Sequence, residues 1–183
     1  MKVLAIYGSP RKDGNSARML DHLIEFLPEQ AEIKRLYLSE KNFSGCCASR
    51  DCKQLGYCPI QDDMQEIYPL LEWAEVIIFA TSTQFADVSA DIKKLMERTW
   101  WMKGKLKNKI GAAVISGRRY MESVINTLNA FMLRQKMILG APPALGYTFT
   151  EMGTIDSDPL ALEDSRKLAL RITEIYNLMK NVE

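Results

Sequence analysis

The fold is decided by the first stretch of the chain, Met1-Lys2-Val3-Leu4-Ala5-Ile6-Tyr7-Gly8-Ser9-Pro10-Arg11-Lys12-Asp13-Gly14-Asn15-Ser16. Its apolar run Val3–Tyr7 is short and continuous, which predicts a strand that is buried on both faces. The turn-forming residues from Gly8 to Pro10 end this strand. Apolar residues then recur at helical spacing and predict a helix, namely Leu20, Leu23, Ile24 and Leu27. A buried strand, a glycine-containing loop and a helix in this order are typical of the first unit of a parallel α/β sheet.

The same alternation continues along the chain, without an internal repeat or a linker. Further buried strands are predicted at 33–38, 76–80, 110–115 and near 143–147. Apolar residues at helical spacing predict helices at about 62–74, 92–100, 124–131 and 168–179. Five buried strands with helices between them indicate one domain, residues 1–183, with a parallel sheet covered on both faces. The candidate ligand-binding residues are those that follow each strand, because ligands bind at the carboxyl edge of such sheets.

Composition and charge exclude several classes of function. Lys and Arg number 24 against 23 Asp and Glu, a net charge of +1, which argues against general binding to a nucleic-acid backbone. His22 is the single histidine, so mechanisms that need two histidines are excluded. No apolar stretch approaches the roughly 18 residues of a membrane span. The run that begins the chain is also too short for a signal peptide, so we expect a cytoplasmic protein without nucleic-acid or membrane partners.

The loop after the first strand has the chemistry of a phosphate-binding site. Gly8 and Gly14 permit tight backbone turns, and the helix that follows offers free N–H groups and a favourable dipole. The dinucleotide pattern G-x-G-x-x-G is absent, and the loop G-x-x-x-x-G-K-[ST] of nucleotide hydrolases does not fit either. A terminal monophosphate held by hydroxyl and amide groups is the remaining candidate, and an unliganded turn is the simpler alternative. The predicted phosphate-binding residues are Ser9, Arg11, Asn15, Ser16 and Ala17.

Two segments of the chain carry a resemblance to a known family. The loop from Gly8 to Ser16 resembles the phosphate loop of the NADPH-dependent FMN reductases, whose fold is flavodoxin-like. The segment from Cys46 to Met64 is similar to the iron–sulfur flavoprotein branch, most specifically in Cys58-Pro59-Ile60-Gln61-Asp62-Asp63-Met64. The resemblance implies a three-layer, doubly wound α/β fold with a five-stranded parallel sheet of order 2-1-3-4-5. It also implies FMN as the cofactor and NAD(P)H as the co-substrate.

By this resemblance, the loops after the third and fourth strands hold the flavin ring and the ribityl chain. The family typically has Thr-Pro-x-Tyr in the first of these loops; here a serine replaces the proline and a glutamine the tyrosine, and Phe85 offers a face for stacking. In the second loop, Arg118 or Arg119 would stabilise a reduced flavin or hold a phosphate of the nicotinamide cofactor, and a solvated arginine pair is the alternative. The implied flavin-binding residues are Thr81, Ser82, Thr83, Gln84, Phe85, Ser116, Gly117 and Arg118.

The predicted helix between these two loops ends in Glu97-Arg98. The corresponding helix of the family typically ends in Asp-Arg, so the resemblance extends to this point with one substitution. We favour the simpler interpretation of residues 90–98, an amphipathic helix whose charges pair on its surface.

All four cysteines lie in one insertion, about residues 39–63, which shows no regular period and is predicted to be an elaborated loop. In a reducing compartment such clustering indicates metal or redox chemistry more than a disulfide framework. The iron–sulfur branch carries C-x2-C-x2-C and a later fourth cysteine; in that register Ser49 takes the second ligand position, and serine is a poor ligand for a cluster. An iron–sulfur cluster, a metal-free or redox-active loop, and a zinc site or disulfide all stay open. The candidate metal ligands are Cys46, Cys47, Cys52 and Cys58.

The sequence therefore predicts an FMN-dependent NAD(P)H oxidoreductase. Hydride would pass from NAD(P)H to FMN, and electrons would then pass to a quinone, a flavin or another small-molecule acceptor. No side chain is needed as an acid or base, so no catalytic residue is predicted. The alternatives are an iron–sulfur flavoprotein that acts as an electron carrier and a non-enzymatic flavodoxin-like regulatory or partner-binding protein. The resemblance also implies a homodimer or homotetramer.

Overall fold

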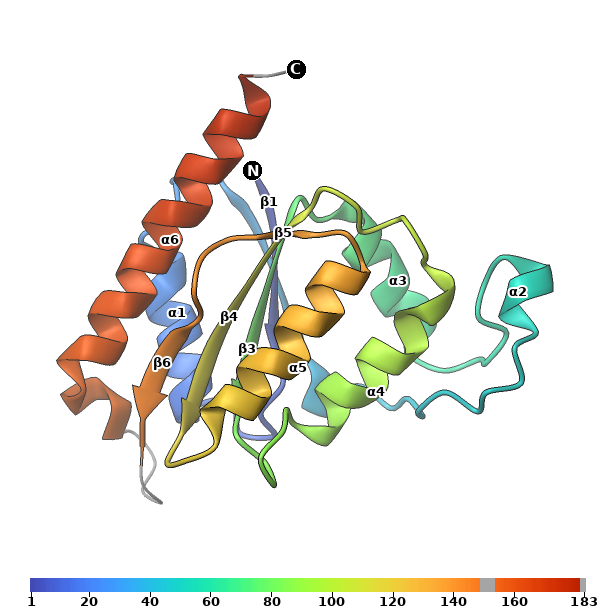
Figure 1. Cartoon of the computed structure of the whole chain (residues 1–183), viewed down its shortest axis with the longest axis horizontal. Helices are drawn as coiled ribbons and strands as arrows, with labels where there is room; N and C mark the ends of the chain where they lie inside the picture. Colours follow the sequence, from blue (N-terminus) through green and yellow to red (C-terminus); the bar gives the residue numbers. More distant parts are fainter. Residues whose placement is uncertain (149–153, 182–183) are drawn as a thin grey trace.

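A six-stranded sheet with the order β2-β1-β3-β4-β5 forms the centre of the molecule (Figure 1). The computed structural model describes residues 1–148 and 154–181. The strands are β1 (Lys2–Tyr7), β2 (Glu32–Tyr37), β3 (Val76–Ser82), β4 (Ile110–Gly117), β5 (Ile138–Leu139) and β6 (Ala144–Tyr147). All pairings between these named strands are parallel, which confirms the doubly wound α/β fold and the expected strand order.

Helices cover both faces of the sheet (Figure 1). Two helices pack on one face and three on the other: α1 (Asn15–Glu25) and α6 (Pro159–Lys180), then α3 (Met64–Trp73), α4 (Ala90–Arg98) and α5 (Met121–Arg134). Successive residues of a strand point to opposite faces. Val3 and Ala5 therefore join the core beside α1 and α6, whereas Leu4 and Ile6 join the other core. Since both faces are buried, the central strands are continuous apolar runs.

The fifth position of the sheet is divided between two short strands. β6 occupies the stretch where the sequence predicts a strand, and β5 precedes it and pairs with the first residues of β4. Between them lie Pro142 and Pro143, which have no N–H group and therefore interrupt the ladder of hydrogen bonds. The fifth strand predicted near 143–147 is thus present, but it is the second of two pieces.

The cysteine-rich insertion leaves the sheet after β2, and the short helix α2 (Cys52–Leu55) lies apart from both helical layers, beyond α4 (Figure 1). Two further 3-10 helices follow or precede long helices: η2 (Thr99–Trp101) comes after α4, and η3 (Thr154–Ser157) comes before α6. Among the helices of residues 1–148 and 154–181, none combines the length and apolar character needed to cross a membrane.

Candidate functional site

The loops after β1, β3 and β4 lie next to one another at the carboxyl edge of the sheet. Gly8 N donates a hydrogen bond to Ala80 O at 2.8 Å, which ties the first loop to the end of β3. Thr83 N donates to Ser116 O at 2.9 Å, which ties the second loop to the end of β4. Three loops that are far apart in the sequence thus form one continuous surface, as expected for ligand binding in a parallel sheet.

The first loop opens onto the N-terminus of α1. Gly14 N donates to Arg11 O, and Arg11 N donates to the hydroxyl of Ser9, both at 3.2 Å, so the loop turns tightly. Ser9 and the first-turn residues Ser16 and Ala17 are buried, while Arg11 is exposed. Gly14 is the N-cap residue of α1 and has no side chain to cap the helix. The first N–H groups of α1 are therefore not satisfied by a capping side chain, which is the arrangement that binds an anion.

Two polar residues of the first loop contact other parts of the chain. Asn15 Oδ1 accepts a hydrogen bond from Ile155 N at 3.3 Å, and its Nδ2 donates to Thr154 Oγ1 at 3.4 Å. Lys12 forms an ion pair with Glu40 at the edge of the sheet. Asn15 therefore connects the first loop to η3, which lies 140 positions later in the chain. It also lies in the loop for which the sequence predicts phosphate binding.

The hydroxyl groups of the second loop fall into two kinds. Thr81 is fully buried; its Oγ1 accepts from Ser89 N and donates to Ser82 O, both at 3.1 Å, so it braces the loop. Ser82 Oγ accepts from Gln84 Nε2 at 3.1 Å. In contrast, Thr83 Oγ1 and Ser89 Oγ are buried and have no hydrogen-bond partner within the described part of the chain. Because buried polar atoms are normally paired, two such orphans at one edge indicate a missing polar ligand.

Phe85 is the most exposed large side chain of the second loop. Its relative exposure is 106%, and its φ of 46° lies in the left-handed region that non-glycine residues rarely adopt. Strained backbone of this kind clusters at binding and active sites. The position of Phe85 is therefore compatible with the ring-stacking role that the sequence predicts for it.

The third loop borders a hollow of about 340 Å³ at the end of β4. Ser116 is buried and accepts the hydrogen bond from Thr83 N, whereas Gly117 packs directly against the Thr83 side chain, so that a Cβ at Gly117 would lie 2.4 Å from Thr83 Oγ1. The two guanidinium groups in the wall make this hollow suitable for an anionic or oxygen-rich group. Its lining residues are Thr83, Arg118, Arg119 and Tyr120.

The four cysteines differ in exposure and surroundings, and all are free thiols. Cys46 and Cys47 are exposed, Cys52 is half-buried and Cys58 is buried. Burial, and then the charges of the nearby Cys58 and Cys46, raise the pKa of the Cys52 thiol. Hydrogen bonds from Ser49 instead lower the pKa of Cys47. Within the residues that the structure describes, no three metal-ligating side chains are arranged to hold a metal ion.

The expectation that Arg98 carries a surface charge is wrong. Its side chain is 0% exposed, and it forms an ion pair with Asp62, with Nη1 at 2.5 Å from Oδ2 and Nη2 at 3.0 Å from Oδ1. The reason is helical geometry: Arg98 lies three residues after Leu95 and six after Ile92, on the buried stripe of α4. Glu97 does stay exposed, and its Oε2 accepts a hydrogen bond from Cys46 N at 3.4 Å.

Burial by itself would lower the pKa of Arg98 and raise the pKa of Asp62. The hydrogen bond between the two side chains, together with the other hydrogen bonds and charges around each group, outweighs burial, so the pKa of Arg98 is raised and that of Asp62 is lowered. The backbone N–H groups of Ser44 and Met64 also donate to Asp62, each at 3.1 Å, and lower its pKa further. The pair therefore stays charged at neutral pH.

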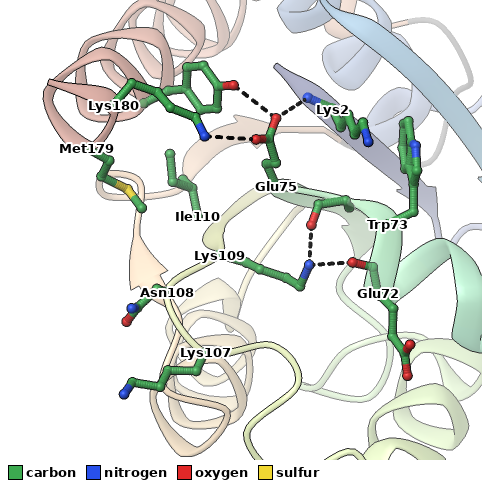
Figure 2. Close-up of a pocket in the computed structure, with 12 residues that line it drawn as sticks. Lys2, Glu72, Trp73, Glu75, Lys107, Asn108, Lys109, Ile110, Met179 and Lys180 are labelled. Carbon is green, nitrogen blue, oxygen red and sulfur yellow. Dashed lines mark hydrogen bonds and ion pairs between the residues drawn. The ribbon is translucent and has the colours of Figure 1, made fainter. Parts of the chain in front are cut away.

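A second hollow, of about 300 Å³, lies at the opposite, amino edge of the sheet (Figure 2). Glu75 accepts hydrogen bonds there from Lys2 N at 2.8 Å and from Tyr176 OH at 3.0 Å. Lys109 Nζ donates to the carbonyl oxygens of Glu72, at 2.7 Å, and Ala74. These groups satisfy one another and end the helix α3. None of the predicted binding residues lies at this edge, so the candidate site is the carboxyl edge.

Comparison with known proteins agrees with this geometry. The family profile described as NADPH-dependent FMN reductase matches residues 1–149. The chain belongs to the NADPH-dependent FMN reductase family. Membership confirms the expectation of an NAD(P)H-dependent oxidoreductase with FMN as cofactor and NAD(P)H as co-substrate. It gives no support to the alternative of a non-enzymatic regulator.

Several relatives of this FMN reductase family chain are named iron-sulfur flavoproteins. An iron-sulfur flavoprotein of Methanocaldococcus jannaschii is 32% identical over 192 residues, with 98% of this chain and 100% of that protein covered. An iron-sulfur flavoprotein of Methanosarcina thermophila is 32% identical over 146 residues, with 76% of each covered.

Solved structures share the fold of this FMN reductase family chain at low sequence identity. RosB with bound 8-demethyl-8-formylriboflavin-5'-phosphate gives a TM-score of 0.81 at 14% identity, covering 99% of this chain and 81% of RosB. The NAD(P)H:quinone oxidoreductase from Methanothermobacter marburgensis gives 0.69 at 16% identity, covering 92% and 94% of the two chains. At these identities the likeness shows the shared fold alone.

Sequence reasoning missed three residues that border the candidate site or the cysteines. Ser89 carries an orphan hydroxyl beside Gly8, and Tyr120 lines the hollow of the third loop with a φ of 61°. Their position directly after the predicted strands was an available signal. Arg98 had only a weak signal, its place on the apolar stripe of α4.

Proposed function

We propose that the chain transfers hydride from NAD(P)H to FMN held at the carboxyl edge and passes the electrons to a small-molecule acceptor, a quinone or a flavin. The observation that carries the proposal is the junction of three loops beside the uncapped N-terminus of α1. The residues fit FMN in two respects. The N-terminus of α1 suits a phosphate. The buried hydroxyls of Thr83 and Ser89, which have no hydrogen-bond partner among the described residues, would be satisfied by a polar ligand.

Each loop contributes a different part of the binding site. Ser9, Ser16 and the backbone of Ala17 hold the phosphate, with Arg11 as the exposed counter-charge and Asn15 beside it. On the flavin side, Thr81 positions the second loop from within, because both roles of its hydroxyl are already taken. The groups that contact ring and ribityl chain are Ser82, Thr83, Gln84, Phe85, Gly117 and Arg118, with Ser116 anchoring the second loop.

Bound FMN supplies the hydride-accepting chemistry, and the protein supplies orientation and electrostatics. Arg118 and Arg119 border the hollow, so they would offset negative charge on the flavin or bind a phosphate of the nicotinamide cofactor. No side chain of the edge has to exchange a proton for this reaction. We therefore assign no acid or base.

The phosphate cradle is tested by comparing FMN with riboflavin, which lacks the phosphate. In a Ser9→Ala/Ser16→Ala variant, we expect the affinity for FMN to fall about 100-fold or more, because two hydrogen bonds to a charged group are lost. The affinity for riboflavin should not change. Ser123→Ala, on the exposed side of α5, is the control. Failure of the wild type to retain FMN at micromolar concentration, or equal losses for both flavins, would overturn the assignment.

The acceptor is tested separately, with NAD(P)H oxidation followed under anaerobic conditions. We expect steady oxidation when a quinone or free flavin is added, and a single reduction of the bound FMN without it. Equal rates with and without an acceptor would contradict the proposed transfer.

A second candidate function is that of an electron carrier with an iron–sulfur cluster in the cysteine segment. The names of the relatives favour it, and the four free thiols within residues 46–58 fit such a cluster in kind and number. In the conformation described they do not converge, so binding requires the segment to close around the iron. Stoichiometric iron and sulfide after anaerobic reconstitution, with no NAD(P)H turnover, would favour the carrier. Iron-free yellow protein that oxidises NAD(P)H would favour the reductase.

We also propose that the chain, as one domain, forms a homodimer or homotetramer in the cytoplasm. Large aromatic side chains are exposed at the carboxyl edge, including Phe85, Tyr120 and Tyr147, and such groups are enriched at subunit contacts. Light scattering coupled to gel filtration measures the state directly, and a monomer at micromolar concentration would contradict this proposal.

A further inference from the structure

The hollow at the amino edge of the sheet is lined by four lysines and two glutamates (Figure 2). Both carboxylates are already balanced by a lysine: Glu72 Oε1 lies 2.5 Å from Lys105 Nζ, and Glu75 Oε1 lies 3.4 Å from Lys180 Nζ. The other lysines of the wall form no ion pair within residues 1–148 and 154–181, namely Lys2, Lys107 and Lys109. Their positive charges therefore border the hollow without a matching carboxylate.

Lys109 is the most buried of these three lysines. Its ammonium group donates to the carbonyl oxygens of Glu72, at 2.7 Å, and Ala74 (Figure 2). An ammonium group has three N–H donors, so one donor is left after these two contacts. Burial lowers the pKa of Lys109, and the charges of Glu72 and Glu75 oppose this only in part. An anion in the hollow would supply the counter-charge that this amine lacks.

Backbone hydrogen bonds between distant segments fix the shape of the hollow. Glu75 N donates to Lys2 O and Ile110 N donates to Glu75 O, both at 2.9 Å, so the starts of β1, β3 and β4 lie side by side. Asn108 N donates to Lys136 O at 3.0 Å. The φ of Asn108 is 64°, in the left-handed region that asparagine tolerates better than most residues. This turn places the two lysines on either side of Asn108 in the same wall.

Positive charge is concentrated at this edge, although the net charge of the whole chain is only +1. The connection from η2 to β4 carries a lysine at every second position from Lys103 to Lys109. Like charges placed so close together repel one another. Packing gives no reason for them, because three of these four side chains are exposed, those of Lys103, Lys105 and Lys107. A concave surface with an excess of one charge attracts small ions of the opposite charge.

The chemistry of the wall favours phosphate over carboxylate. Lysine binds phosphate as a point charge, whereas arginine provides the planar pair of donors that suits a carboxylate. The described residues that line the hollow include lysines and the amide of Asn108 but no arginine. The volume of about 300 Å³ is at the lower end of the range for small-molecule sites, so it admits a compact anion.

We propose that the hollow at the amino edge binds a small, free molecule that carries phosphate, with Lys107, Asn108 and Lys109 as its contacts and Lys2 at the rim. The site lies at the opposite edge of the sheet from the three loops proposed to hold FMN, so it does not depend on the proposed function. Because the ligand contacts residues from several segments, it stabilises the folded protein by mass action.

The first test titrates inorganic pyrophosphate into the FMN-saturated protein by calorimetry at constant ionic strength. Saturation with FMN keeps the probe away from the first loop, and we expect one pyrophosphate to bind per chain. Lys107→Glu should weaken this binding about tenfold or more, because a positive charge beside the phosphate becomes negative. Lys103→Glu is the matched control: it makes the same change of charge in the same connection, outside the hollow, and should have much less effect.

A second variant tests the inner amine. Lys109→Gln should also weaken pyrophosphate binding about tenfold or more, because the ammonium charge is lost. Glutamine keeps an N–H donor for the carbonyl oxygens at the end of α3. If Lys109→Gln does not fold, Lys107→Glu carries the comparison, since the side chain of Lys107 is exposed.

Amide hydrogen exchange locates the bound anion. We expect pyrophosphate to slow exchange at Asn108 and Ile110, whose N–H groups hold the wall of the hollow, because the ligand stabilises the segment that contains them. Slowing that is confined to the first loop, at Asn15 and Ser16, would overturn the site at the amino edge.

The remaining outcomes are equally distinct. No saturable binding, or equal weakening by Lys107→Glu and Lys103→Glu, would overturn the proposal. Binding to phosphatidic acid vesicles without binding of free pyrophosphate would overturn it too, because the ligand would then be a lipid surface. If the chain does not retain FMN, the proposed function fails. Pyrophosphate binding that persists in the Ser9→Ala/Ser16→Ala variant and depends on Lys107 would still support this site.

Discussion

The backbones of Gln84 and Asp87 exchange two hydrogen bonds, of 2.8 and 2.9 Å, across the dipeptide Phe85-Ala86. Both residues of the dipeptide have positive φ, 46° and 60°, as in the two-residue turns that normally take Asn-Gly. A phenylalanine in this conformation is strained, and its side chain is exposed at the edge where the three loops meet. The protein thus keeps Phe85-Ala86 in this turn, although residues such as Asn-Gly would make the folded state more stable.

Replacing Phe85-Ala86 with Asn-Gly should stabilise the protein and weaken its function. We expect a gain of about 1–2 kcal/mol in the free energy of unfolding, because both residues then suit the turn. Affinity for the flavin or NAD(P)H turnover should fall, since the stacking face of Phe85 is lost. Urea denaturation and flavin titration measure the two effects. A variant that gains stability and keeps full turnover would show that Phe85 has no role in the site.

Gly8→Ala should disturb the start of α4. A Cβ at Gly8 would lie 2.3 Å from Ile92 Cδ1, and Ile92 is fully buried, so it has no free space to move into. Overpacking of this kind costs about 1–3 kcal/mol. In a double-mutant cycle with Ile92→Ala, the combined loss should be smaller than the sum of the two single losses. Strict additivity in urea denaturation would contradict this contact.

Asn15 should show separate effects on stability and on phosphate binding. Asn15→Ala loses the hydrogen bonds to Ile155 and Thr154 and should cost about 1 kcal/mol, with faster amide exchange at Ile155. Asn15→Asp keeps the acceptor for Ile155 N and suits the N-terminus of α1, so stability should hold. Its negative charge should nevertheless weaken FMN binding. Equal flavin affinity in Asn15→Asp and the wild type would place the phosphate elsewhere.

The pair of Asp62 and Arg98 predicts an acid-dependent loss of stability. Although burial opposes ionisation, the hydrogen bonds from Arg98 and two backbone N–H groups hold the pKa of Asp62 below its ordinary value. Its contribution is therefore complete above about pH 4, the ordinary value for Asp, and is lost as the pH falls through the lower pKa of the folded state.

Asp62→Asn is the variant that measures this contribution. We expect it to be less stable than the wild type by on the order of 2–3 kcal/mol at pH 7, because Arg98 loses its buried counter-charge. The difference should shrink below about pH 4, where the wild type also loses the charge. Asp164→Asn, on the exposed side of α6, is the control. A stability difference that is constant from pH 7 to pH 3 would rule out the ion pair as its source.

Much of the fold could be predicted because it depends on local pattern. The continuous apolar run of β1 and the glycine-containing loop after it indicate a parallel sheet, and the strand order follows from the family resemblance. β5 was missed because a strand of two residues has too little pattern to stand out beside Pro142 and Pro143. The loops of the candidate site were predictable for the same reason, since they directly follow predicted strands.

The sequence by itself determined the class of fold, the edge where ligand binding is expected and the residue types available there. Only the tertiary structure decided what these residues contact. Asn15 hydrogen-bonds to η3, and Thr81 braces its own loop. Arg98 pairs with Asp62, which lies 36 positions earlier in the chain. The physical reason is distance along the chain. Periodicity and turn chemistry act over a few residues, whereas a buried hydrogen bond or ion pair depends on groups that only folding brings together.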